Sequence, residues 1–246
     1  MLKTEVLPER TRKLFEEIRY DPVLADFTLI GGTAISLLVG HRSSMDLDFC
    51  TFEQQLPVYK IDQFIQFLKN DGHQVFDATE PNKQAQFKIN TGKNLADFAR
   101  DYVIDGVKVT FFAYDAPNKT KAFLASQDAY RDLASFKIMS LKGLFTTKCL
   151  LPERRNKSRD LFDLWYLIDK EGFSVDDMFD VIESYSDSMM IDHTVYVLTG
   201  EDPVDDETDE GLDAVDVEMS LEALYVFFDK AISQYQQARS EKSFLD

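Results

Sequence analysis

The chain has 246 residues, of which 44% are hydrophobic and 29% charged, and this balance is typical of a globular protein. The formal net charge is −17, from 27 basic and 44 acidic residues, which argues against a surface that coats nucleic acid with positive charge throughout. The charge is unevenly spread: residues 1–170 carry 24 basic and 23 acidic side chains, whereas residues 171–246 carry 3 and 21.

Several protein classes are disfavoured by what the sequence lacks. The two cysteines form no CxxC pair and the three histidines are scattered, so neither a disulfide framework nor a histidine zinc site is expected. No apolar run approaches the roughly 20 residues that span a bilayer, and the amino terminus has no signal-like apolar region. We therefore expect a cytoplasmic protein that makes no membrane contact.

The first half of the chain alternates between helix and strand patterns. Apolar spacing predicts helices between Pro8 and Asp21, over 33–39 and over 58–70. Strands are predicted over 27–30, 46–52, 73–77, 84–90 and 101–114, the last folded at a turn of Asp105-Gly106.

From residue 127 onward the pattern predicts helices only, over 128–145, 158–170, 174–187 and 219–240. Ser158 and Ser174 are predicted N-caps, and Gly172 a helix stop. The expected fold class is α+β, with a mixed-sheet domain over 1–125 followed by a helical domain over 126–246. The segment 201–218 carries ten carboxylates and no basic residue, which favours a solvated loop.

Two carboxylates in the strand over 46–52 are the first candidate for chemistry. The strand period of two places Asp46 and Asp48 on one face, about 7 Å apart along the strand. Like charges at this distance favour a cation, and hard oxygen ligands suit Mg²⁺. The alternative is a pair of acids on a solvent-facing strand.

The segment before these acids supplies candidate phosphate ligands. Gly31-Gly32 ends one strand and opens a helix, where free backbone N–H groups can hold phosphate oxygens. Ser44 adds a hydroxyl and Arg42 a positive charge beside the expected polyphosphate. A phosphate site next to a metal site indicates phosphoryl chemistry.

Gly31-Gly32, His41-Arg42, Ser44, Asp46 and Asp48 together resemble the first motif of the nucleotidyltransferase superfamily. The sequence of this motif is more closely similar to that of the AbiEii toxin family of abortive-infection and toxin–antitoxin systems, which includes the MenT toxins. In that family a helical lysine and an Arg-Asp-x-x-Asp-Leu segment follow the sheet domain. The matching residues here are Lys137 and the segment from Arg159 to Leu164.

The resemblance implies a Mg²⁺-dependent transferase that moves a nucleoside monophosphate from an NTP to an acceptor, with release of pyrophosphate. Lys137 would neutralise charge on the leaving group, and Asp160 would be an active-site carboxylate with Asp163 or Arg159 as its structural neighbour. The residues alone leave alternatives open. Lys137 could pack its stem while its amine reaches water, and Asp160 could interact with the helix dipole.

One position departs from the superfamily pattern. The strand that should supply a third carboxylate, which commonly acts as general base, presents Thr110 instead. Asp160 could substitute for it. Otherwise the chain is a catalytically silent nucleotide-binding or interaction module. A further alternative is an unrelated globular protein in which these motifs occur by chance.

The resemblance implies a toxin-like role with an RNA, tRNA or protein acceptor and a cognate antitoxin as partner. A small-molecule acceptor, as in antibiotic-modifying relatives, stays open. RNA contact is expected at Arg154, Arg155 and Lys157, which could equally form an exposed loop. The acidic segment 201–218 could cover the acceptor groove or bind a basic partner, or it could be a solvated loop.

Overall fold

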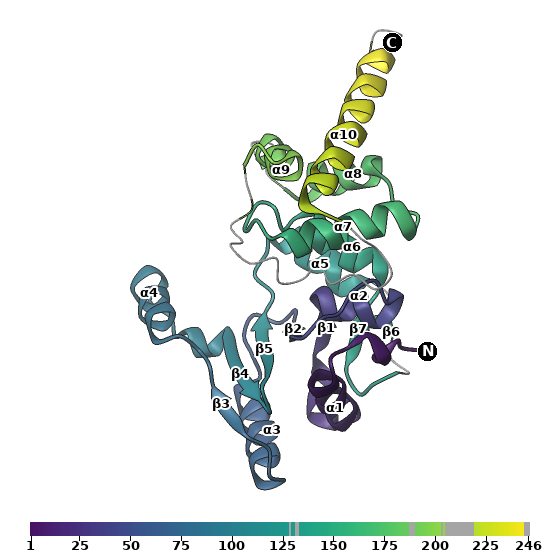
Figure 1. Ribbon diagram of the computed structural model, residues 1–246. Coiled ribbons are helices and arrows are strands. Elements are labelled where there is room, and N and C mark those ends of the chain that lie inside the picture. Colours follow the sequence, from purple (N-terminus) through teal and green to yellow (C-terminus); the bar gives the residue numbers. More distant parts are fainter. Residues whose placement is uncertain (128, 131–132, 187–189, 203, 205–218, 244–246) are drawn as a thin grey trace. The chain divides into compact units, whose positions relative to one another are not determined.

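A computed structural model describes residues 1–127, 129–130, 133–186, 190–202, 204 and 219–243. The chain divides into two compact units, Met1–Gly143 with a mixed sheet and Leu144–Asp246 with helices (Figure 1). The predicted α+β class, a mixed sheet followed by helices, is confirmed. In the described part of the chain, no helix is both long and apolar enough to cross a membrane.

The sheet of the first unit has seven strands in the order β3-β4-β5-β2-β1-β7-β6. The pairs β2–β5 and β1–β7 are parallel, and the other neighbouring pairs are antiparallel. The strands are β1 (Thr28–Ile30), β2 (Leu47–Thr51), β3 (Val75–Asp77), β4 (Ala99–Ile104), β5 (Val107–Ala113), β6 (Ala129–Tyr130) and β7 (Lys137–Met139).

One face of this sheet is covered by the predicted amphipathic helices α1 (Glu9–Ile18) and α3 (Val58–Asn70). Phe49 on β2 lies 5.5 Å from Phe111 on β5, ring centre to ring centre. Phe64 of α3 meets Phe111 edge-on, and Phe15 of α1 meets Phe136. Each buried phenylalanine stabilises the fold by about 1.5–3 kcal/mol. Because side chains alternate along β2, Asp48 lies on the opposite face from this core.

The predicted hairpin at Asp105-Gly106 joins β4 to β5. Both residues have positive φ, 49° and 82°, as a two-residue type I′ turn requires. The turn sets the register in which Asp101 of β4 pairs with Thr110 of β5.

The strand predicted over 84–90 is wrong, because these residues belong to helix α4 (Pro81–Thr91). Pro81 occupies the first turn, where its missing N–H costs nothing, and Gly92 ends the helix at a φ of 69°. No residue of α4 is buried, and the helix projects away from the sheet (Figure 1). The weak alternation of polar and apolar residues over 84–90 therefore belongs to an exposed helix and does not indicate a strand.

The helix predicted over 128–145 is also wrong. Its described residues form β6 and β7, and a helix, α6 (Leu141–Cys149), begins only at Leu141. Ile138 is fully buried and pairs with Leu29 of β1. This segment therefore joins the sheet, although its apolar spacing also matches a helix. Lys137 consequently lies on a strand and not on a helix.

The second unit consists of helices that pack through apolar faces. Phe179 of α8 stacks on Tyr235 of α10 with ring centres 4.3 Å apart. Ser174 forms the predicted cap, as a capping box with Asp177, whereas Lys157 and not Ser158 occupies the cap position of α7. The helices that follow α6 are α7 (Ser158–Lys170), α8 (Val175–Tyr185), α9 (Met190–Thr199) and α10 (Leu221–Ser243).

Candidate functional site

A glycine pair at the junction of β1 and helix α2 (Gly31–Val39) shapes the candidate site in the first unit. Gly31 has a φ of 79°, which a side chain rarely tolerates. A Cβ atom at Gly31 would lie 2.9 Å from Oδ2 of Asp48, and one at Gly32 would clash with Nη2 of Arg42. The glycines therefore allow the carboxylate and the guanidinium to approach the first turn of α2.

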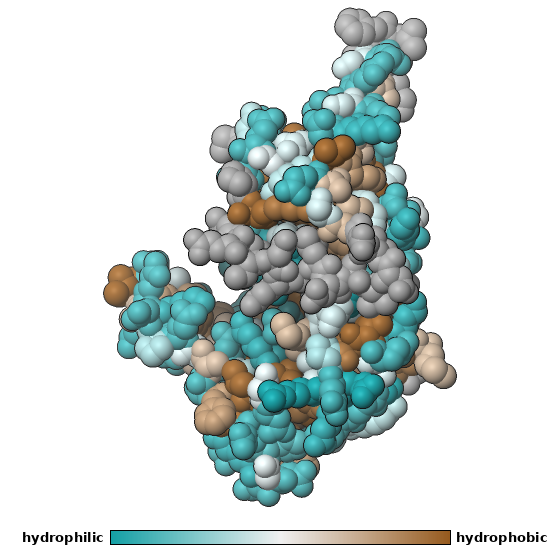
Figure 2. Space-filling view, viewed as in Figure 1, coloured by the Kyte–Doolittle hydropathy of each residue, from teal (hydrophilic) through white to brown (hydrophobic). Residues whose placement is uncertain are grey.

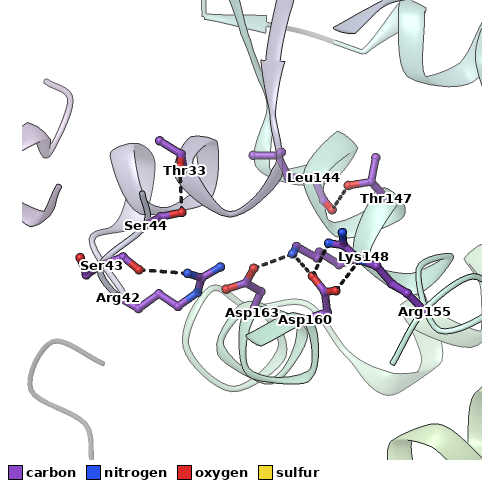
Figure 3. Close-up of polar contacts among 10 residues, drawn as sticks. All are labelled: Thr33, Arg42, Ser43, Ser44, Leu144, Thr147, Lys148, Arg155, Asp160 and Asp163. Atoms are coloured by element: carbon purple, nitrogen blue, oxygen red, sulfur yellow. Dashed lines mark hydrogen bonds and ion pairs between the residues drawn. The ribbon is translucent and has the colours of Figure 1, made fainter. Parts of the chain in front are cut away.

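Buried polar side chains surround this turn (Figure 3). The Thr33 hydroxyl donates a hydrogen bond to the backbone oxygen of Asp46 and accepts one of 2.8 Å from the Ser44 hydroxyl. Arg42, only 4% exposed, donates to the backbone oxygen of Ser43 at 3.0 Å. The loop before β2 is thereby fixed against α2, which brings Gly31, Gly32, Arg42 and Ser44 together as the sequence predicted.

The two predicted metal ligands lie at the start of β2. Asp48 is the second residue of the strand, between Ile30 of β1 and Thr110 of β5, and Asp46 directly precedes the strand. Both residues are half-buried. In the described residues no group of three or more His, Cys, Asp or Glu side chains is arranged to hold a metal ion. Two carboxylates with substrate phosphates and water suffice for Mg²⁺, which rarely occupies an all-protein cage.

A further carboxylate, Asp101, shares this sheet face and was missed by the sequence analysis. Thr110 pairs with Asp48 on one side and with Asp101 on the other, so all three side chains project from the same face. The Thr110 hydroxyl donates to Oδ1 of Asp101 at 2.8 Å. Two strand spacings place the Cα atoms of Asp48 and Asp101 about 10 Å apart. Only the register of the hairpin could have revealed this neighbour.

Lys137 reaches the same sheet face from β7. It pairs with Thr28 of β1, which pairs in turn with Cys50 of β2, two residues beyond Asp48. Burial raises the pKa of Cys50 far above its usual range, the negative charge of Asp48 raises it further, and Lys137 opposes this shift. Lys137 therefore projects from the same sheet face as Asp48, but from a strand and not from a helix.

Gly31→Ala tests the close approach of Asp48, and Gly72→Ala is a matched control. Gly72 also has positive φ, 97°, but a Cβ there would meet nothing within 4 Å. Both variants should lose about 1–2 kcal/mol of unfolding free energy through backbone strain. Only Gly31→Ala should also weaken binding of Mg²⁺–NTP, by at least about ten-fold, because it displaces the Asp48 carboxylate. Equal NTP affinity in the two variants, measured by calorimetry, would contradict this geometry.

The second unit contains a buried ion cluster that involves the predicted Asp160 (Figure 3). The ammonium of Lys148 lies 2.6 Å from Oδ1 of Asp160 and 2.6 Å from Oδ2 of Asp163. The guanidinium of Arg155 contacts both oxygens of Asp160, at 2.8 and 3.1 Å. Lys148, Asp160 and Asp163 are at most 4% exposed. Both oxygens of Asp160 are therefore already hydrogen-bonded to cations.

Lys148 was missed by the sequence analysis, which assigned the lysine of the resemblance to Lys137. A signal did exist: two acids at i and i+3 on an apolar helix require a buried cation. Asp163 is the structural neighbour of Asp160, because Lys148 bridges the two carboxylates.

The cluster predicts an acid-dependent loss of stability. Burial alone would raise the pKa of Asp160, but attraction by Lys148 and Arg155 outweighs it, so the pKa lies below the usual 3.8. A lowered pKa in the folded state stabilises the fold above pH 3.8, and this stabilisation is lost as the pH falls through the folded value. Urea unfolding between pH 5 and pH 3 should show this loss in the wild type, with a slope of up to about 1.4 kcal/mol per pH unit for this one proton.

Asp160→Asn should remove this component of the pH slope. The control is Asp180→Asn, which replaces an exposed carboxylate on α8 and should leave the slope as in the wild type. An identical slope in Asp160→Asn and the wild type would refute the role of the ion cluster in acid stability.

The structure describes only part of two other predicted features, the RNA-contact residues and the acidic segment. Arg155, a predicted RNA contact, has a 45% exposed side chain that also binds Asp160, so it is not simply an exposed loop cation. The acidic segment 201–218 lies outside the described residues except for 201, 202 and 204.

Comparisons with known proteins cover nearly the whole chain. A family model described as the nucleotidyl transferase AbiEii toxin of type IV toxin–antitoxin systems matches residues 12–244. An uncharacterized protein of Aquifex aeolicus (strain VF5) is 25% identical over 236 residues, which cover 93% of this chain and 97% of the relative.

Proposed function

Because the chain belongs to the AbiEii nucleotidyl transferase toxin family, we propose that it transfers a nucleoside monophosphate from an NTP to an RNA acceptor with Mg²⁺. The observation that supports this most is the close approach of Asp48 and Arg42 to the glycine turn that opens α2. A helix start, whose first N–H groups have no partner within the helix, together with a buried guanidinium and a pair of carboxylates, matches a metal-bound triphosphate.

The proposal gives each side chain of the first unit one task. Asp46 and Asp48 hold Mg²⁺, which supplies positive charge beside the phosphates when bound. Gly31, Gly32 and Ser44 bind phosphate oxygens through N–H and O–H groups, and Arg42 balances their charge.

The bond changes follow from this arrangement. The acceptor hydroxyl oxygen bonds to the α-phosphorus, and the bond from the α-phosphorus to the bridging oxygen of pyrophosphate breaks. Lys137 stabilises the negative charge that develops on pyrophosphate. Asp101 takes the proton of the attacking hydroxyl, the task that the sequence had left without a strand carboxylate. For Asp160 we propose a structural role in the second unit, because both of its oxygens already accept hydrogen bonds from Lys148 and Arg155.

A second candidate is a silent module that binds NTP without transfer. The observation in its favour is Thr110, which stands beside Asp48 where superfamily members present an acid. A small-molecule acceptor is the remaining alternative for the transferase. We further propose that the protein acts in the cytoplasm and is controlled by a cognate antitoxin, in keeping with its family.

The test is pyrophosphate release from each of the four NTPs with Mg²⁺, with and without total RNA. We expect release with one preferred NTP, stimulated by RNA, together with α-phosphate label in the RNA. Binding of Mg²⁺–NTP without release under any condition would favour the silent module. Release stimulated by an aminoglycoside-type small molecule but not by RNA would favour the small-molecule acceptor.

A further inference from the structure

Positive charge gathers on two segments of the first unit despite the acidic net charge of the chain. Residues 81–93, which include α4, contain Lys83, Lys88 and Lys93 and no acidic residue. Residues 117–126, which include α5 (Asn118–Ser126), contain Lys119 and Lys121 and again no acidic residue. Lys83 pairs with Glu80 at 2.7 Å, but the two segments are still locally basic in a chain of net charge −17, which favours a polyanion.

A pocket of about 420 Å³ lies where these two segments meet the sheet. Its walls come from the ends of β2 and β5 together with α4 and α5. It is separate from the candidate site, because Gln54 and Gln55 follow β2 whereas Asp46 precedes it. The lining residues are Gln54, Gln55, Phe87, Thr91, Lys93, Phe98, Ala113, Tyr114, Asp115 and Lys121.

Three aromatic rings line this otherwise polar pocket. Phe87 of α4 lies 5.6 Å from Phe98, ring centre to ring centre, and neither ring is fully buried. The ammonium of Lys93 lies 5.3 Å from the centre of the Phe98 ring. Tyr114 packs on Phe52, with ring centres 5.8 Å apart. Phe87 is half-buried, so part of its ring remains accessible to a ligand.

The surface around α4 is largely hydrophilic (Figure 2), so these rings are not part of a broad apolar contact surface. Ring faces next to ammonium groups fit a nucleobase and its phosphate, since bases stack on aromatic side chains and phosphates pair with lysine. The amides of Gln54 and Gln55 offer both donors and acceptors for base edges. An acidic peptide would use the lysines but not the flat rings, and a duplex would keep its bases stacked away from them.

We propose that this pocket binds a single-stranded RNA segment, with one nucleobase against Phe87 and Phe98 and the flanking phosphates beside Lys93 and Lys121. The RNA is the acceptor of the transfer reaction, and this assignment rests on the proposed function. The binding itself does not, because it requires neither NTP nor metal.

Fluorescence anisotropy with a short labelled single-stranded RNA and the full chain, without NTP, tests the proposal. Lys93→Gln/Lys121→Gln should weaken binding at least about ten-fold at low salt, and should reduce the slope of log affinity against log salt by about 1.4, or 0.7 for each lost phosphate contact. Lys13→Gln/Lys69→Gln makes the same charge change at exposed positions elsewhere in the first unit and should leave the slope unchanged.

A second pair of variants separates stacking from charge. Phe87→Leu should weaken binding about five-fold or more with an unchanged salt slope, whereas Phe87→Tyr keeps the aromatic face and should bind as the wild type does. Equal effects of the two lysine pairs, no effect of Phe87→Leu, or equally effective competition by a polyglutamate peptide would each overturn the proposal.

The failure of this proposal can be told apart from failure of the proposed function. Asp46→Asn should lose transfer but bind RNA normally. If RNA binding depends on Lys93 and Phe87 but the chain shows no transferase activity, the RNA-binding proposal stands and only the proposed transfer reaction is refuted. Transfer to RNA that is indifferent to the pocket variants would refute the pocket and leave the transferase standing.

Discussion

Asp48→Asn is expected to lower the rate of nucleotidyl transfer at least about a thousand-fold while the protein remains folded. Asparagine has nearly the same shape as aspartate but removes the negative charge that would hold Mg²⁺ beside the phosphates. The position lies beside Gly31, with Oδ2 at 2.9 Å from the site of a Cβ there, so an isosteric change is required to avoid a clash. Single-turnover transfer of label from α-labelled NTP measures the effect.

Asp71→Asn is the matched control, because Asp71 is an exposed carboxylate after α3 in the same unit. It should transfer as the wild type does. Asp101→Asn should also reduce the rate, but with little change in NTP affinity, if Asp101 accepts the proton as proposed. A rate for Asp48→Asn within ten-fold of the control would contradict its assignment as a metal ligand.

Lys148→Met should destabilise the protein by about 3–5 kcal/mol, which is the largest stability effect that we predict. The substitution removes the cation that bridges Asp160 and Asp163, and Asp163 is fully buried. A buried carboxylate without its cation is far more costly than a missing surface ion pair. Urea unfolding at neutral pH measures the change.

Two variants isolate the cause of this loss. Lys230→Met replaces an exposed lysine on α10 and should change stability by no more than about 0.5 kcal/mol. Lys148→Met/Asp160→Asn/Asp163→Asn removes the charges together with the lysine and should recover part of the stability. A triple variant that is less stable than Lys148→Met alone would show that unpaired charge is not the cause.

The fold could be predicted where local patterns and tertiary packing agree. The stripe of Ile61, Phe64 and Leu68 defined α3, and the Asp105-Gly106 turn defined the β4–β5 hairpin. The patterns misled where packing decided the outcome. Leu133, Lys137, Leu141 and Leu144 have helical spacing, but pairing with β1 makes 137–139 a strand. Helix α4 has no buried residue, so its sequence carries no clear helical stripe.

The candidate site shows the same division between local and distant information. Gly31, Gly32, Arg42, Ser44 and Asp48 lie within one short stretch of sequence, so their proximity could be predicted from one strand–turn–helix unit. Asp101 joins Asp48 only through the pairing of β4, β5 and β2, and the pairing of Lys148 with Asp160 depends on the packing of α6 against α7. Such neighbours follow from tertiary structure and cannot be read from spacing.

The most direct test of the central claim is the mass of both products in one reaction that contains the wild-type chain, Mg²⁺, the preferred NTP and RNA. We predict that RNA gains the mass of one or more nucleoside monophosphates and that one pyrophosphate is released for each addition. RNA of unchanged mass, or release of orthophosphate in place of pyrophosphate, would contradict a nucleotidyl transfer to RNA at this site.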